Sequence, residues 1–89
     1  MTAMTDREHR MKRLRFRAWH RGTQELDLLI GRFADAHLES MDNGQLERFE
    51  AFMERPDPEV HGWLVRRLPV PDEARDDIVD LIFDFHKLP

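Results

Sequence analysis

The sequence predicts an all-α protein, a compact five-helix bundle that forms a single domain over residues 1–89. Apolar residues recur at helical spacing along nearly the whole chain, and no stretch alternates as a half-buried strand would. Tyr is absent and β-branched residues are few, which also disfavours a sheet. A chain of 89 residues has a thin core, so we expect a surface site rather than a large internal cavity.

The first two helices are expected at about 6–20 and from Thr23 to about residue 39. Met11, Leu14 and Ala18 form the apolar stripe of the first helix. Gly22 stands where a left-handed residue without Cβ commonly ends a helix, and Thr23 can cap the next one. The apolar stripe of the second helix comprises Leu26, Leu29, Ile30, Phe33, Ala34 and His37.

Asp42 is expected to cap a third helix, with Gln45 three residues later completing a capping box. Pro56 ends that helix, and Asp57 as cap with Pro58 at the first helical position begins the fourth. The buried faces of these two helices are expected to comprise Leu46, Phe49, Phe52 and Met53, followed by Val60, Trp63, Leu64 and Leu68.

Asp72 and Glu73 are expected to open a fifth helix, after prolines have ended the fourth. Its inner face comprises Ala74, Ile78, Leu81, Ile82 and Phe85. Two glycines, Gly31 and Gly62, fall inside predicted helices, where each costs about 1 kcal/mol relative to Ala. We expect close packing of neighbouring helices at both glycines.

The absence of cysteine excludes a disulfide framework, thiolate metal sites and thiol nucleophiles. Small secreted domains usually need disulfides, so we expect an intracellular protein, cytoplasmic in a bacterium and in the mitochondrial matrix in a eukaryote. The sequence contains no stretch long and apolar enough for a membrane span. The Arg-rich start contains Asp6 and Glu8 but no serine, so it is interpreted as part of the mature fold rather than a presequence.

The sequence carries no recognisable catalytic or metal-binding constellation. The five histidines, His9, His20, His37, His61 and His86, include no pair at i+3 or i+4, so no metal site is expected. Ser40 is the single serine and is expected at a helix end, and no glycine-rich phosphate loop is present. We therefore expect a binding protein with no catalytic residues and no firmly bound cofactor.

The net charge of −4 is distributed very unevenly. Residues 1–21 contain seven Lys or Arg against two acidic residues, whereas residues 22–89 contain seven against sixteen. A basic first helix on an acidic body indicates an interaction surface. The basic residues of the first segment are Arg7, Arg10, Lys12, Arg13, Arg15, Arg17 and Arg21.

The corner between the first two helices is the most distinctive part of the sequence. Phe16 and Trp19 share a helix face away from the apolar stripe, so one apolar face either covers a loop or awaits a partner. Gly22 turns the chain and brings Arg21 close to Glu25. Two interpretations remain open: an ion pair worth about 0–1 kcal/mol that locks the corner, or two side chains presented outward to another protein.

The segment Arg21-Gly22-Thr23-Gln24-Glu25 resembles the RGxxE motif of the succinate dehydrogenase assembly factor family, the small flavinator proteins of bacteria and mitochondria. The resemblance covers residues 11–86. One departure is Gly44-Gln45, where the family more often has acidic residues. Further matching positions are Leu26, Asp27, Leu46, Phe49, Glu50, Asp57, Pro58, Glu59, Trp63 and Leu64.

The resemblance implies a chaperone that binds the flavoprotein subunit of succinate dehydrogenase, and in some bacteria of fumarate reductase. Such proteins promote covalent attachment of FAD to a histidine of that subunit, and the bond is made by the subunit's own residues. FAD would thus be the cofactor of the partner, and we expect this chain to be a monomer when free. The partner-binding residues implied are Arg17, Arg21, Gly22, Glu25 and Asp27.

The residues suggest two other functions. Segment 12–17 interleaves basic and aromatic residues as a nucleic-acid-binding helix does. The acidic body and the absence of a recognised module argue against it, so no nucleic-acid partner is expected. A regulatory interaction protein, such as an antitoxin-like inhibitor, would use the same exposed helix and stays an alternative.

Overall fold

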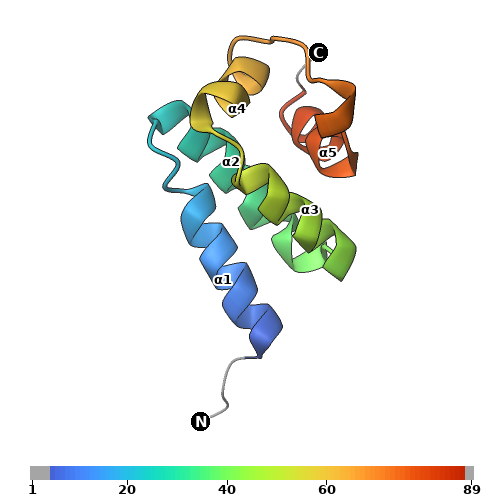
Figure 1. The fold of residues 1–89 in the computed structure, drawn as a ribbon. Coiled ribbons are helices and arrows are strands. Elements are labelled where there is room, and N and C mark those ends of the chain that lie inside the picture. Colours follow the sequence, from blue (N-terminus) through green and yellow to red (C-terminus); the bar gives the residue numbers. More distant parts are fainter. Residues whose placement is uncertain (1–4, 88–89) are drawn as a thin grey trace.

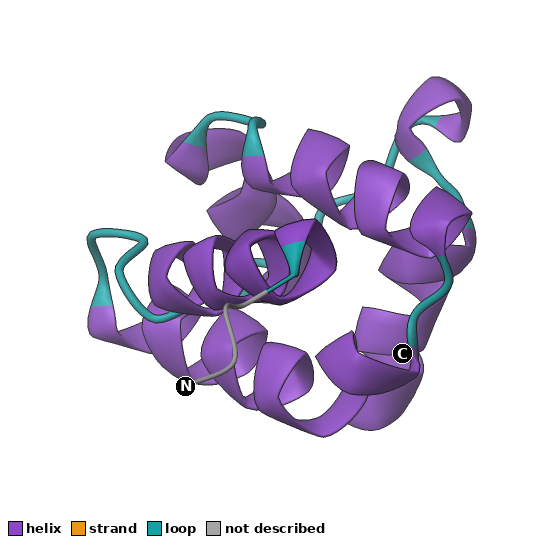
Figure 2. Ribbon diagram, turned by 90° about the horizontal axis from the view of Figure 1, so that it is seen from below, coloured by secondary structure: helices purple, strands orange, loops and turns teal. Residues whose placement is uncertain are grey.

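A computed structural model describes residues 5–87 of the chain (Figure 1). Within this range every regular element is helical, which confirms the predicted all-α class (Figure 2). The α-helices are α1 (Asp6–Ala18), α2 (Gln24–His37), α3 (Asn43–Met53), α4 (Asp57–Leu64) and α5 (Asp77–Phe85), and single 3₁₀ turns cover Leu38–Ser40 and Asp72–Ala74.

Helix α2 occupies the centre of the bundle and contacts α1, α4 and α5. Helix α1 packs mainly along α2 and also touches α3, while α3 packs against α5. Phe33 of α2 and Phe49 of α3 are fully buried and meet edge to face, with ring centroids 5.8 Å apart. The fully buried residues of the described chain are all apolar, so packing of the predicted stripes holds the helices together.

Side-chain caps define most of the helix starts. Thr23 accepts a hydrogen bond from the backbone N–H of Leu26, as predicted. Asp42 and Gln45 form the predicted capping box at the start of α3. Thr5 forms a further capping box at the start of α1, which ends at Ala18, two residues earlier than expected.

The starts of the last two helices differ from the prediction. Pro56 is the N-cap of α4, so Asp57 and Pro58 take its first two helical positions. Residues 72–74 form only a 3₁₀ turn, and α5 begins at Asp77. The reason is Asp76, whose carboxylate accepts a hydrogen bond from the backbone N–H of Val79 at 3.0 Å and so caps α5.

The prediction that Leu68 lines the fourth helix was wrong, because α4 ends at Leu64. Arg67 adopts the left-handed conformation (φ 60°), and the chain reverses there. The backbone N–H of Leu68 then bonds to the carbonyl of Gly62 at 2.8 Å, and the Leu68 side chain packs over that glycine. The absence of a side chain at Gly62 therefore makes room for the loop that carries Leu68, and not for a neighbouring helix.

Gly31 does permit close packing, as expected. The ring of Trp19, the C-cap residue of α1, lies against the backbone of α2 at this point. A Cβ on Gly31 would fall within 2.8 Å of three atoms of that ring. The second apolar face expected on the first helix is thus divided: Trp19 is covered by α2, whereas Phe16 remains 65% exposed.

Candidate functional site

The corner between α1 and α2 is a short turn held by backbone and side-chain hydrogen bonds. Gly22 has a φ of 109°, which residues with a Cβ rarely adopt, and Thr23 caps α2 immediately afterwards. The carboxylate of Asp27, one turn into α2, accepts a hydrogen bond from the backbone N–H of Arg21 at 2.6 Å. Asp27 therefore closes the turn from within its own chain.

The side chain of Arg21 points into the fold and is only 8% exposed. Its guanidinium donates to the carbonyl oxygens of Met53 at 2.5 Å and Arg55 at 3.0 Å. Backbone carbonyls at the end of a helix lack partners within that helix and carry partial negative charge, so a guanidinium is well suited to them. Arg21 thus joins the corner to the C-terminal end of α3.

Asp57 completes this contact from the first position of α4. One of its carboxylate oxygens lies 2.7 Å from Nη2 of Arg21. Nε of Arg21 is also buried and has no hydrogen-bond partner within the described part of the chain. We call Arg21, Gly22, Asp27 and Asp57 the corner lock, because together they hold the α1–α2 turn against the α3–α4 junction.

The Arg21 side chain is therefore directed into the fold and not outward, and within the described residues it forms no ion pair with Glu25. Contact of Arg21 with a partner stays a prediction. The helix-end carbonyls and Asp57 take up the guanidinium from the inner side of the turn. Glu25 is oriented outward instead, with 63% of its side chain exposed. The imidazole Nε2 of His61, in α4, lies 3.9 Å from a Glu25 carboxylate oxygen.

Arg17 lies on the exposed side of α1, one turn before the corner. Its guanidinium is 2.8 Å from the carboxylate of Glu54, whose side chain is 69% exposed. Exposed pairs of this kind contribute little to stability, so Arg17 is available for exchange with an external anion. Of the five predicted site residues, Arg21 and Asp27 are joined by a hydrogen bond across the turn, Gly22 lies exposed between them, and Glu25 and Arg17 have outward side chains.

A shallow groove of about 370 Å³ begins beside Glu25 and runs between α2 and the end of α4. Leu28 and Arg32 follow Glu25 on the exposed face of α2, and Val65 and Arg67 line the opposite side. Sequence reasoning missed this groove and also missed Asp57 and His61 as neighbours of the motif. The Asp-Pro pair was explained as a helix start, which left no reason to seek a partner for Asp57.

The groups available at this corner suit recognition of another molecule: a carboxylate, an exchangeable guanidinium and an apolar groove.

Within residues 5–87, no group of three or more His, Cys, Asp or Glu side chains is placed to hold a metal ion. None of the helices in the described part of the chain is both long and apolar enough to cross a bilayer.

Comparison with known proteins places the chain in a family. The profile of the Sdh5 family, described as flavinator of succinate dehydrogenase, matches residues 12–86. The "FAD assembly factor SdhE" of Acetobacter pasteurianus is 50% identical over 64 residues, which cover 72% of this chain and 59% of the relative. No solved structure matches the chain significantly.

Mitochondrial relatives are more distant. The "Succinate dehydrogenase assembly factor 2, mitochondrial" of Dictyostelium discoideum is 30% identical over 71 residues, covering 80% of this chain and 50% of the relative. The protein of the same name from Meyerozyma guilliermondii is 34% identical over 73 residues, covering 79% and 54%. The chain thus spans between half and three fifths of the length of these relatives. The family resemblance noted in the sequence is confirmed, and the chain belongs to the succinate dehydrogenase flavinator family.

Proposed function

We propose that this chain is an assembly factor that binds the flavoprotein subunit of succinate dehydrogenase, or of fumarate reductase, and promotes covalent attachment of FAD to it. The family description and the name of the Acetobacter relative support this function. The observation that carries the docking site is an outward carboxylate, Glu25, on a turn made rigid from inside by Arg21. The protein would work in the compartment of its client, the bacterial cytoplasm or the mitochondrial matrix.

The five predicted site residues have two different tasks in this proposal. Glu25 and Arg17 contact the client directly, with Glu25 facing a cationic group of the flavoprotein. Arg21, Gly22 and Asp27 are positioning residues that fix the turn on which Glu25 stands. Preorganised contacts bind more tightly because little freedom is lost on association.

The chain contributes no reactive group to the flavin bond in this proposal, and FAD remains the cofactor of the client. Docking would hold the flavoprotein in a conformation in which its acceptor side chain meets the flavin. Correct orientation of two reacting groups can by itself accelerate a reaction by many orders of magnitude.

The test compares Glu25→Gln with a matched control, Glu73→Gln, which alters an exposed carboxylate on the connection between α4 and α5. Each variant is introduced into a host that lacks the wild-type gene, and covalent flavin on the flavoprotein subunit is measured by in-gel fluorescence. We expect Glu25→Gln to weaken client binding about tenfold, a loss of about 1.4 kcal/mol, and to reduce flavinylation.

Two outcomes would contradict the proposal at different levels. A flavoprotein that acquires its flavin equally well without this chain would exclude the function itself. A Glu25→Gln protein that supports flavinylation as well as Glu73→Gln would leave the function intact and remove Glu25 from the docking site.

A further inference from the structure

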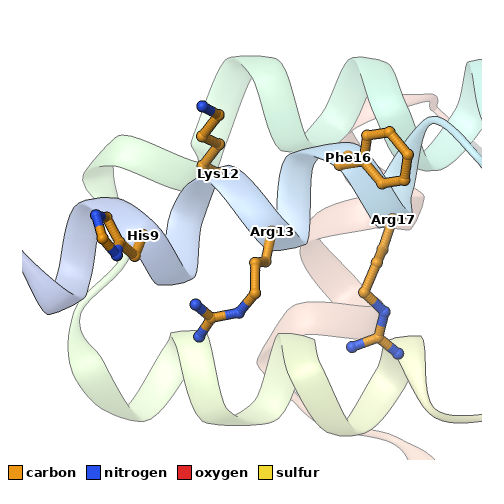
Figure 3. A pocket seen from close by; sticks show the side chains of 5 residues that line it. All are labelled: His9, Lys12, Arg13, Phe16 and Arg17. Atoms are coloured by element: carbon orange, nitrogen blue, oxygen red, sulfur yellow. The ribbon is translucent and has the colours of Figure 1, made fainter. Parts of the chain in front are cut away.

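The outer face of α1 carries a second surface that the motif does not include. His9, Lys12, Arg13, Phe16 and Arg17 line a shallow pocket of about 580 Å³. Figure 3 shows Lys12 and Phe16 on one side of the helix axis, with Arg13 and Arg17 on the other. The spacing places His9, Lys12 and Phe16 on the side of the helix opposite the buried Leu14 and Ala18, with Arg13 and Arg17 along one edge of that side. We call these five residues the α1 basic surface.

The basic residues of α1 are divided by their surroundings. Those directed toward the bundle have partners inside it: Arg10 pairs with Glu50, and Arg15 with Asp35. Lys12 and Arg13 are exposed and form no ion pair within residues 5–87. Lys12 and Arg13 therefore give the α1 basic surface positive charge that the fold does not neutralise, whereas Arg17 pairs with Glu54.

Phe16 gives this charged surface an apolar centre. It is the most exposed large hydrophobic side chain in the described part of the chain. Its ring stacks on that of His20 with centroids 4.0 Å apart, and a ring nitrogen of His20 lies 2.6 Å from the Phe16 carbonyl oxygen. The aromatic ring is thus held in place beside the cations and is not packed in the core.

We propose that the α1 basic surface docks an acidic segment of the client flavoprotein, with an apolar side chain of that segment packed on Phe16. This inference rests on the proposed function and adds a second contact to it. Arg17 belongs to both surfaces, so one client can extend from the Glu25 corner along α1. Complementary charge accelerates association and makes it sensitive to salt.

The charge distribution favours an acidic protein segment over a nucleic acid. Beyond residue 21 the chain has sixteen acidic residues against seven Lys or Arg. A long polyanion would meet repulsion from this body as soon as it extended past α1, whereas a short acidic segment would not.

The test uses two double variants that change the net charge equally. Lys12→Glu with Arg13→Glu alters the α1 basic surface, and Arg66→Glu with Lys87→Glu alters two exposed cations elsewhere. Association with the purified flavoprotein subunit before flavinylation is measured at about 50 mM and about 300 mM salt. We expect the first variant to associate about tenfold more slowly at low salt, with a weaker salt dependence, and the control to change less than about twofold.

Phe16→Ser tests the apolar part independently, and we expect faster dissociation with an unchanged salt dependence. Equal association rates for both double variants would overturn the inference. If Glu25→Gln still weakened client binding in that case, the proposed function would be upheld. Failure of the wild-type chain to bind the subunit would instead contradict the proposed function.

The same variants distinguish the acidic client segment from two other possible occupants of the α1 basic surface. Binding of the wild type to a DNA or RNA duplex, abolished in the Lys12/Arg13 variant while client association is unchanged, would assign the surface to nucleic acid. Loss of a wild-type dimer in that variant, with client association again unchanged, would assign it to a second copy of the chain. Either result overturns the inference.

Discussion

Asp57, the first residue of α4, lies 2.7 Å from the guanidinium of Arg21, and this contact ties the RGxxE motif to the junction of α3 and α4. The same guanidinium satisfies two carbonyls at the end of α3. The arginine of the motif therefore acts within the fold, and the glutamate of the motif acts at its surface. A variant of Arg21 is expected to change both the stability and the proposed docking surface, whereas a variant of Glu25 tests the proposed docking alone.

Arg21→Ala is expected to lower the free energy of unfolding by about 2–3 kcal/mol, because two partly buried carbonyls and a carboxylate lose a charged donor. Arg21→Lys should recover only part of this, since one ammonium cannot reproduce the planar fork. Urea denaturation followed by circular dichroism measures both. Arg17→Ala is the control, with a loss of about 0–1 kcal/mol. Equal losses for the Arg21→Ala and Arg17→Ala variants would show that Arg21 has no special structural role.

Asp57→Asn is expected to destabilise the protein by about 1 kcal/mol, since its side chain is 40% exposed and solvent screens the pair. Combined with Arg21→Ala in a double-mutant cycle, it should show a coupling of about 1 kcal/mol. Strictly additive effects would mean that the two side chains do not interact in solution.

The fold could be predicted well from the sequence because local signals and burial agree. The capping box of Asp42 and Gln45 and the cap at Thr23 specified two helix starts. The errors arose where a nonlocal or competing contact determines where a helix begins or how the chain continues after it. Asp76 competes successfully with Asp72 as the cap of α5, and the reversal at Arg67 carries Leu68 away from α4.

The candidate site could be predicted only in part. The motif located the corner and the exposed Glu25, but spacing along the chain suggested Glu25 as the partner of Arg21. The actual partners lie on α3 and α4 and become neighbours only through tertiary packing. Asp57 looks like an ordinary helix-start residue in the sequence, so no local signal indicates that it also pairs with Arg21.

Gly22→Ala is expected to cost about 1–3 kcal/mol, because the positive φ strains any residue with a Cβ. The added methyl would also lie 3.3 Å from a carboxylate oxygen of Asp57 and press on the corner lock. Thermal unfolding measures the loss, and a melting temperature equal to that of the wild type would contradict the observed turn.

Gly31→Ala is expected to destabilise the protein by about 1–3 kcal/mol through overpacking against Trp19, although Ala favours a helix by about 1 kcal/mol. Gly44→Ala is the matched control, since its Cβ would meet chiefly the flexible end of Arg48. Gly44→Ala should be as stable as the wild type or slightly more stable, and urea denaturation measures both variants. A stabilising Gly31→Ala would show that Trp19 does not pack on α2 in solution.

The pairing of Arg48 with Asp77, which links α3 to α5, predicts a specific pH dependence. The Arg48 guanidinium donates to both carboxylate oxygens, at 2.6 and 3.0 Å, and this lowers the pKa of Asp77 from its ordinary value of 3.8. A carboxyl group with a lowered pKa in the folded state adds stability above its ordinary pKa, and this contribution is lost as the pH falls through the lowered value.

Asp77→Asn should therefore be less stable than the wild type at neutral pH, by a small amount because the pair is solvent-exposed. The difference should shrink below pH 3.8 and disappear in stronger acid, as measured by urea denaturation across this range. In an Arg48→Gln background the same substitution should lose most of its pH dependence, since the main cause of the lowered pKa is gone. An undiminished dependence there would assign the effect to another neighbour of Asp77, such as Gln45, whose amide lies 3.4 Å from the carboxylate.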